Sequence, residues 1–294
     1  MLLCVYKSKT ETGDNSMDRY LFNKFVFEMD DELYGDSCVA FAKMAKNIVR
    51  KPNDKKVTFN YYPQEQERLQ LVIEGVIDDT SAQIGEVKIH HTSEDVWKLK
   101  IVTAIDQCDG SYLATRPDGN GLVAVRLANE QVLDAIESDN IIEAQVVAFA
   151  VNVDIYQDEK AYANSIAPSA DGQKLLMKDG LIVATNYLVN NNANLTTEER
   201  NNKEHCFDNL VDICGTITTC NKFPLNMFNM DLNNYYMANV MTDFGPLKIF
   251  IAQPLFPKNI EGFGAGNVIV GKIMISGDVC IYDYDKYASA LNPN

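Results

Sequence analysis

The chain contains an internal repeat, which constrains its architecture more than any single motif does. Residues 155–168 and 281–293 both begin with Ile-Tyr and both continue through a Lys, a Tyr and a Pro. From Tyr162 and Tyr287 to the two prolines the offset is a constant 125 residues. A repeated unit of this size predicts two copies of one fold within a single chain.

The repeat extends towards the N-terminus through segments that have the composition of β-strands. Their offsets change only between segments, where loops absorb insertions. We therefore place copy A at residues 69–168 and copy B at residues 207–294, joined by a connector at residues 169–206. The matched segments are residues 71–77 with 211–217, 97–103 with 236–242, 121–127 with 245–251, and 140–149 with 267–276.

Each copy predicts a small antiparallel unit of five strands. The matched segments alternate apolar and polar residues and are rich in Val, Ile, Tyr, Phe and Thr. Gly75 and Gly215 interrupt the first strand of each copy, which favours a sharp bend there. Before the fourth strand, copy A has a short helical run at residues 129–137, and copy B has Pro254 and Pro257 instead.

Five strands with a glycine-broken first strand and a variable insertion before the fourth resemble the oligonucleotide/oligosaccharide-binding (OB) fold. The resemblance concerns the strand pattern and implies one closed barrel in each copy. A pair of open β-sandwich or meander domains is the alternative. The expected fold class is mainly β, α+β overall, with two tandem OB-like five-stranded antiparallel barrels after a small N-terminal part.

The N-terminal part, residues 1–68, predicts a small α+β unit. We expect strands at residues 20–27 and 56–62. Apolar residues at helical spacing predict an amphipathic helix over residues 38–49, which Pro52 follows. In the connector, an Asn-rich loop at residues 190–194 precedes a capping-box pattern, which predicts a brief helix.

The negative charge of the chain is concentrated in copy A. The chain has a net charge of −15, and residues 69–168 contribute 17 acidic and 6 basic side chains. Lys and Arg contacts with phosphates normally dominate affinity for nucleic acids, so copy A is a poor nucleic-acid module. The acidity favours a basic partner, although solubility is a simpler explanation of it.

Copy B carries aromatic residues where an OB barrel binds its ligands. On that barrel the second and third strands form the usual platform, and aromatic rings there can stack on bases. Alternatively, these rings fill the core, although neighbouring Tyr235 and Tyr236 must point to opposite faces of a strand. The candidate binding residues in copy B are Tyr235, Tyr236, Phe228 and Phe250.

Basic residues cluster in the N-terminal part. Lys43, Lys46 and Arg50 are three to four residues apart, so they form one stripe on the expected helix. Three interpretations compete: an ordinary solvated face, an internal partner for the acidic copy A, or a docking patch for a phosphate or an acidic protein.

Motifs for catalysis, metals and cofactors are missing from the sequence. His90 and His91 are adjacent and would point to opposite faces of a strand, and no zinc-ligand spacing surrounds them. Phosphate-binding and nucleophile motifs do not occur. We expect a non-enzymatic protein with neither metal nor cofactor. Seven cysteines, an odd number without a C-x-x-C pair, and the lack of a signal-peptide pattern favour a cytoplasmic location. No apolar run approaches the length of a membrane span.

The sequence therefore predicts an acidic binding protein. The leading hypothesis is protein–protein recognition, as an adaptor, subunit or inhibitor, with a partner of basic character. The alternative is binding of single-stranded nucleic acid by the aromatic face of copy B, assisted by the N-terminal basic stripe.

Overall fold

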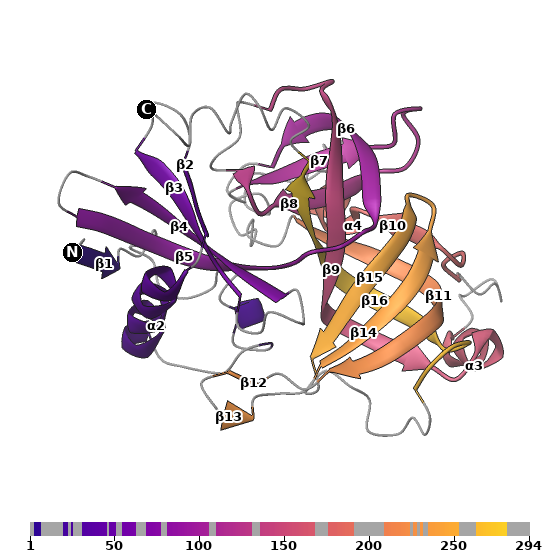
Figure 1. Cartoon of the computed structure of the whole chain (residues 1–294). Coiled ribbons are helices and arrows are strands. Elements are labelled where there is room, and N and C mark those ends of the chain that lie inside the picture. The colour runs from indigo at the N-terminus through magenta and orange to yellow at the C-terminus, as the bar shows by residue number, and fades with distance from the viewer. Residues whose placement is uncertain are drawn as a thin grey trace.

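The protein is mainly β, with two large sheets that lie side by side (Figure 1). A two-stranded ribbon, β12 (Asn226–Met227) with β13 (Met230–Asp231), is separate from both. The computed structural model describes residues 3–6, 20–22, 25, 31–45, 47–50, 55–62, 69–77, 81–105, 110–130, 136–167, 176–190, 209–223, 226–227, 230–231, 235–252 and 263–280.

The N-terminal sheet has five strands in the order β1-β5-β4-β3-β2. Helix α2 (Asp31–Met44) lies against one face of this sheet (Figure 1). Between helix and sheet, the ring of Phe22 packs edge-on against Tyr34 and also contacts Phe41. The strands are β1 (Leu3–Tyr6), β2 (Asn47–Arg50), β3 (Lys56–Tyr61), β4 (Leu69–Ile77) and β5 (Ser81–His91).

Two elements of this part differ from the sequence prediction. Helix α2 begins and ends earlier than the expected helix at residues 38–49, and the last three positions of the expected helix, residues 47–49, belong to strand β2. The adjacent β-branched residues Ile48 and Val49 favour the extended conformation and pair with Phe59 and Thr58 of β3. The expected strand at residues 20–27 is wrong at the positions described, because residues 20–22 and 25 are helical.

The second sheet contains nine strands in the order β10-β11-β14-β15-β9-β16-β8-β7-β6. Two short helices accompany it, α3 (Glu159–Ser165) and α4 (Thr185–Asn190). Its strands are β6 (Val96–Ala104), β7 (Ser111–Thr115), β8 (Val123–Leu127), β9 (Ile141–Tyr156), β10 (Leu181–Val183), β11 (Leu210–Phe223), β14 (Tyr235–Thr242), β15 (Gly245–Ala252) and β16 (Val268–Val279).

Hydrogen-bonded pairing in this sheet closes two rings of five strands each. The first ring runs β6-β7-β8-β16-β9 and back to β6. The second ring runs β11-β14-β15-β9-β16 and back to β11. Both rings contain β9 and β16, which are 16 and 12 residues long. The structure therefore differs from two self-contained barrels, because each ring takes one strand from the other half.

The two rings are related by a pseudo-two-fold axis at the pair Ala148–Ile275. Strands β9 and β16 run antiparallel at this pair, and Ile275 follows Ala148 by 127 residues. This is the sequence offset that relates residues 140–149 to residues 267–276, so each residue of the pair is the repeat equivalent of the other. Ala148 also pairs with Ile249 of β15, while Ile275 pairs with Val125 of β8. Val125 and Ile249 are themselves separated by the offset of 124 that relates residues 121–127 to 245–251.

The remaining strands follow the same symmetry with different offsets from those expected. Strand β6 pairs with β9 in the same way that β11 pairs with β16. Each residue of β11 follows its counterpart in β6 by 116 positions. In both rings the next pairing is interrupted at equivalent places, between Ile101 and Thr103 and between Ile217 and Thr219. The structural counterpart of residues 97–103 is therefore in β11 and not in residues 236–242.

Strand β4 lies outside the rings, although the sequence matched residues 71–77 with 211–217. It pairs with β3 on one edge and β5 on the other, within the N-terminal sheet. The alternating pattern that predicted a strand carries no information on which partner that strand pairs with. Division of the chain into tandem copies with these boundaries remains a prediction.

Gly75 and Gly215 lie where a neighbouring side chain leaves no room for a Cβ atom. A Cβ atom on Gly75 would be 2.8 Å from the ring of Phe59, and one on Gly215 would collide with Val240. The pairing of β4 with β5 also shifts register between Ile73 and Gly75, as expected of a bulge at a strand glycine.

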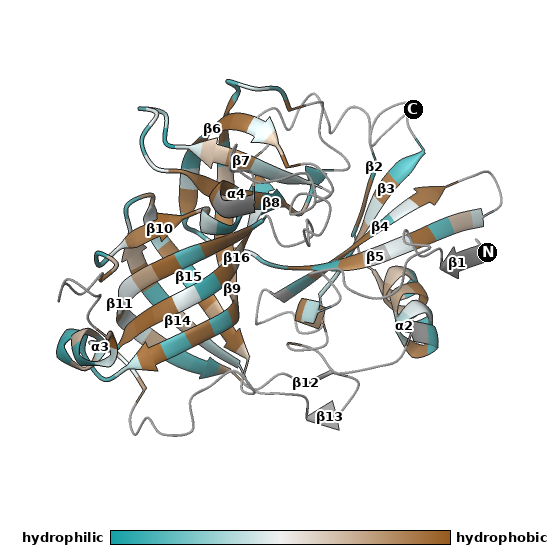
Figure 2. Ribbon diagram, turned by 180° about the vertical axis from the view of Figure 1, so that it is seen from behind, coloured by the Kyte–Doolittle hydropathy of each residue, from teal (hydrophilic) through white to brown (hydrophobic). Residues whose placement is uncertain are grey.

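Two apolar cores hold this arrangement together. One fills the rings and includes Trp97, whose indole N–H donates to the carbonyl of Pro246 at 2.9 Å. The other lies between the two sheets and joins Phe59 and Ile89 of the N-terminal sheet to Phe149 and Phe250 of the rings. Apolar segments run along most strands of both sheets (Figure 2). The N-terminal sheet is therefore packed onto the rings.

Candidate functional site

The outer faces of β6 and β11 occupy equivalent positions on the two rings, and within the described part of the chain a helix packs on the β11 face. Residues of both strands alternate between the ring interior and the outside. The equivalent outward pairs, from the first ring and the second, are Val96 and Asp212, Lys98 and Cys214, Lys100 and Thr216, Val102 and Thr218, Ile141 and Val268, and Glu143 and Val270.

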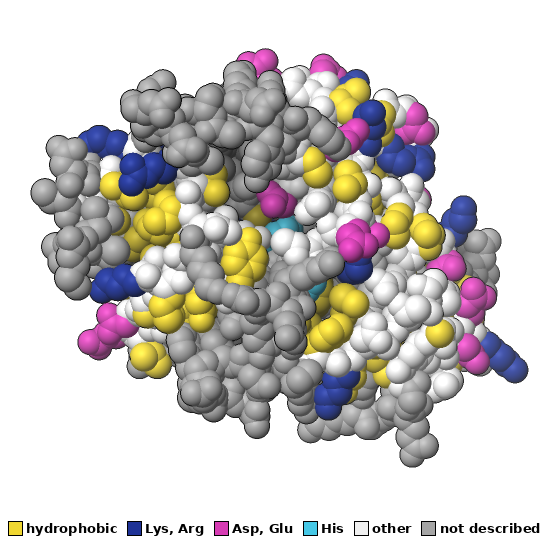
Figure 3. Space-filling model, viewed as in Figure 1, with side chains coloured by type: hydrophobic (Ala, Val, Ile, Leu, Met, Phe, Trp, Pro, Cys, Tyr) yellow, Lys and Arg dark blue, Asp and Glu magenta, His cyan; other side chains and the backbone are white. Residues whose placement is uncertain are grey.

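Among the described residues, the face of the first ring carries exposed apolar side chains. Val96 is 44% exposed, Val102 40% and Ile141 53%. Between them Lys98 forms an ion pair with Glu143 at 3.6 Å, and Lys100 forms one with Asp139 at 2.9 Å. Figure 3 shows hydrophobic, basic and acidic side chains close together over this part of the surface. We call Val96, Lys98, Lys100, Val102, Ile141 and Glu143 the open face.

The surroundings of the open face are acidic. Residues 92–105, 110–130 and 136–156, which contain the four first-half strands, include eight carboxylates and four basic side chains. One of the four, Arg126, is buried. Glu94 and Glu137 are exposed just before β6 and just before β9. These described segments of the first ring therefore carry more acidic than basic side chains.

The equivalent face of the second ring is covered by α3. Asp158 caps this helix, since its carboxylate accepts a hydrogen bond from the Ala161 N–H at 2.7 Å. The ring of Tyr162 is buried against Cys214 and Val268. Its hydroxyl accepts a hydrogen bond from the Met177 N–H at 3.2 Å. Thus the segment after β9 covers the opposite ring.

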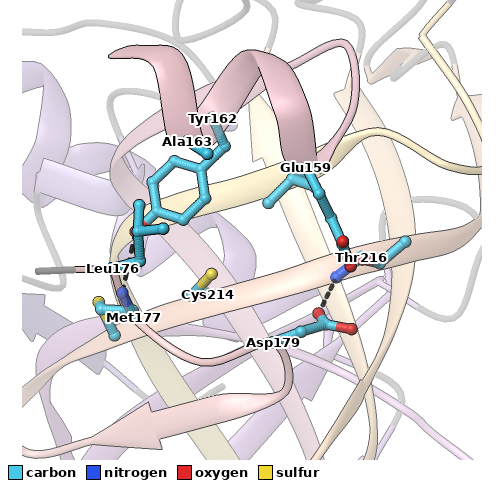
Figure 4. A pocket seen from close by; sticks show the side chains of 9 residues that line it. Glu159, Tyr162, Ala163, Leu176, Met177, Asp179, Cys214 and Thr216 are labelled. Carbon is cyan, nitrogen blue, oxygen red and sulfur yellow. Dashed lines mark hydrogen bonds between the residues drawn. The ribbon is translucent and has the colours of Figure 1, made fainter. Parts of the chain in front are cut away.

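Beneath α3 a pocket of about 250 Å³ remains (Figure 4). Cys214 lies at its floor, and burial, followed by the charges of Asp179 and Glu159, raises the pKa of this thiol. Such a thiol is protonated at neutral pH and is a poor nucleophile. The pocket is lined by Glu159, Tyr162, Ala163, Leu176, Met177, Asp179, Cys214, Thr216 and Val268.

Polar groups are buried where β5 crosses the rings. Arg126 of β8 donates to the Ile89 carbonyl at 2.8 Å, and burial lowers its pKa to about 9. His90 is fully buried, and its Nδ1 is 3.0 Å from the Ser276 hydroxyl. Burial lowers the pKa of His90 to about 3, so its imidazole is neutral at physiological pH.

Three further ionisable groups belong to this junction. The ammonium of Lys88 lies 2.6 Å from a carboxylate oxygen of Glu74, and both side chains are nearly inaccessible. Burial raises the pKa of Asp278, on β16, to about 6. These groups sit within the packing of the two sheets and bear on stability rather than on ligand access.

The aromatic residues predicted to bind ligands are mostly internal. Tyr235 and Phe250 are buried, 2% and 1% exposed, in the core between the sheets, which corrects their placement on a ligand platform. Tyr235 and Tyr236 point to opposite faces, as expected, and Tyr236 is half-buried against Phe263. Phe228 lies outside the described residues.

The predicted basic stripe does not lie on one helix. Lys43 is in the last turn of α2, whereas Arg50 belongs to β2, and both are exposed. The three-to-four-residue spacing that would align them applies only to a continuous helix. Lys46 lies outside the described residues.

Sequence reasoning missed the open face, the pocket and the buried polar cluster. The lysines at alternate positions between Val96 and Val102 signalled an outward face, and Arg126 within an apolar strand signalled a buried charge. Among the described residues no cluster of three metal-ligating side chains occurs. None of their helices is long and apolar enough to cross a membrane.

Comparison of the chain with protein-family models, curated proteins and solved structures found no match.

Proposed function

We propose that this chain is a non-catalytic protein-recognition module that binds a basic protein through the open face. The observation that carries the proposal is the contrast between the equivalent faces. Helix α3 buries Cys214 and Val268 on the face of the second ring, whereas Val96, Val102 and Ile141 on the face of the first ring are exposed. Apolar side chains ringed by charges are typical of protein-binding surfaces.

The chemistry of the partner follows from charge. The open face lies among exposed carboxylates, including Glu94 and Glu137, so complementarity favours a partner with Lys or Arg around an apolar anchor. Nucleic acid would be repelled by the same surface. In this proposal the two rings are OB-like units fused through β9 and β16, because each has the five strands of an OB barrel.

The test is capture with a photo-reactive residue. Benzoylphenylalanine would replace Ile141 on the open face or, as a matched control, Met241, which is 59% exposed on β14. In cells that make this protein, we expect the Ile141 probe to cross-link a basic protein and the Met241 probe not to do so. The cross-link should weaken when Glu94 and Glu137 are both replaced by Lys.

Two results would contradict the proposal. One is a partner captured equally by both probes, or indifferent to the charge reversal. The other is tight, salt-sensitive binding of a labelled single-stranded oligonucleotide, measured by fluorescence anisotropy at low salt, which would support the nucleic-acid alternative instead.

A further inference from the structure

The pocket beneath α3 brings two carboxylates together without a basic side chain among its lining residues. Glu159 comes from the first turn of α3, and Asp179 accepts a hydrogen bond from the Thr216 N–H at 2.7 Å. Figure 4 shows both carboxylates next to Thr216, on the same side of the pocket. A cation placed between the two carboxylates would be attracted by both.

The other side of the pocket is apolar. Leu176, Met177 and Val268 line it, together with the ring of Tyr162. Its volume of about 250 Å³ is below the roughly 300–1,000 Å³ of sites for drug-sized ligands, so only a small ligand fits.

We propose that this pocket binds a primary alkylammonium ion, with its charged end between Glu159 and Asp179. An ammonium group has three N–H donors. The two carboxylates supply acceptors, and the Thr216 hydroxyl, whose oxygen is buried and has no hydrogen-bond partner among the described residues, supplies a third. The alkyl chain lies along the apolar side, beside Tyr162.

The first ring carries basic side chains at the strand positions equivalent to Cys214 and Thr216. The counterparts of Cys214 and Thr216 are Lys98 and Lys100, and the ammonium of Lys100 pairs with Asp139 at 2.9 Å. The first ring thus provides its own ammonium groups on this face. The second ring has acids but, among the residues lining its pocket, no cation.

The proposal is tested with butylammonium and its uncharged analogue butan-1-ol, using saturation-transfer NMR and calorimetry on the full chain. We expect butylammonium to bind at least about tenfold more tightly than butan-1-ol, a difference of ~1.4 kcal/mol. Glu159→Gln and Asp179→Asn should each weaken butylammonium binding by about tenfold or more. Trp97 fluorescence verifies that each variant is folded.

Thr216→Lys introduces the lysine that the first ring has at the equivalent position, Lys100. This variant should lose butylammonium binding and keep its fold. Lys100→Thr, the reciprocal change on the open face, should leave binding unchanged. Equal binding of butylammonium and butan-1-ol would overturn the proposal, as would undiminished binding to Asp179→Asn. Binding of Ca²⁺ with no binding of butylammonium would also overturn it. None of these outcomes depends on the protein partner proposed for the open face.

Discussion

Arg126 and Phe250 occupy equivalent positions on the two sides of the pseudo-two-fold axis. Arg126 pairs with Ser276 across β8 and β16, whereas Phe250 pairs with Phe149 across β15 and β9, with ring centroids 5.6 Å apart. Both lie under β5, since Arg126 donates to the Ile89 carbonyl and the Phe250 ring contacts His91. Strand β5 of the N-terminal sheet therefore contacts an arginine on the first ring and a phenylalanine at the equivalent position of the second ring.

Truncation at either position should destabilise the fold for different reasons. Phe250→Ala leaves a cavity and should lower the free energy of unfolding by about 3–5 kcal/mol. Arg126→Ala leaves the Ile89 carbonyl without its donor and should cost about 3 kcal/mol, whereas Arg126→Met, which retains volume, should cost less. Urea denaturation followed by Trp97 fluorescence measures each value. Equal losses for Arg126→Ala and Arg126→Met would contradict this account of Arg126.

The buried pair Lys88–Glu74 predicts strong coupling. Glu74→Gln or Lys88→Met alone leaves one buried charge without its partner, which should cost about 3–5 kcal/mol. The double replacement removes both charges and should cost much less than the sum of the two single replacements. A double-mutant cycle from chemical denaturation measures the coupling. Additive single and double values would show that the two groups do not interact.

The raised pKa of Asp278 predicts a pH dependence of stability. Its pKa rises from 3.8 to about 6 on folding, so between these values the folded state binds the extra proton and stability falls as pH rises. Asp278→Asn removes this penalty and should raise the free energy of unfolding by about 1–2 kcal/mol at pH 7.5. The gain should vanish below about pH 4, where the carboxyl is protonated in both states. A gain that is constant between pH 4 and pH 7.5 would contradict burial as its cause.

Gly215 should tolerate no side chain. A Cβ atom there collides with Val240, whereas a Cβ atom on Gly264 would have no neighbouring atom within 4 Å. Gly215→Ala should therefore lower the free energy of unfolding by about 1–3 kcal/mol or more, as overpacking does, and Gly264→Ala should be nearly neutral. Thermal unfolding of the two variants tests the difference, and similar melting temperatures would count against the packing argument.

Much of the β architecture was accessible from the sequence because alternation and β-branched composition are local signals. The sequence placed the segments of β3, β8 and β16 within strands, and its offsets of 124 and 127 recur in the pairing around Ala148 and Ile275. Strand partners were not accessible. Nothing local distinguishes β4, which joins the N-terminal sheet, from a first strand of the rings.

The candidate sites were harder to predict because they depend on which face is covered. Tyr235 and Phe250 have the residue type of a ligand platform, but the N-terminal sheet packs over them. Conversely, Val96 and Ile141 have the residue type of a core and remain exposed. Residue type reports what a side chain prefers, while burial depends on contacts between segments far apart in the sequence.

The central claim, that the open face binds a basic protein, is tested most directly by methyl NMR. Ile and Val methyl groups of the full chain would be labelled and titrated with the partner captured through Ile141. The account predicts that the signals of Val96, Val102 and Ile141 shift, while that of the equivalent covered residue, Val268, does not. Shifts confined to the second ring, or none on the open face, would contradict it.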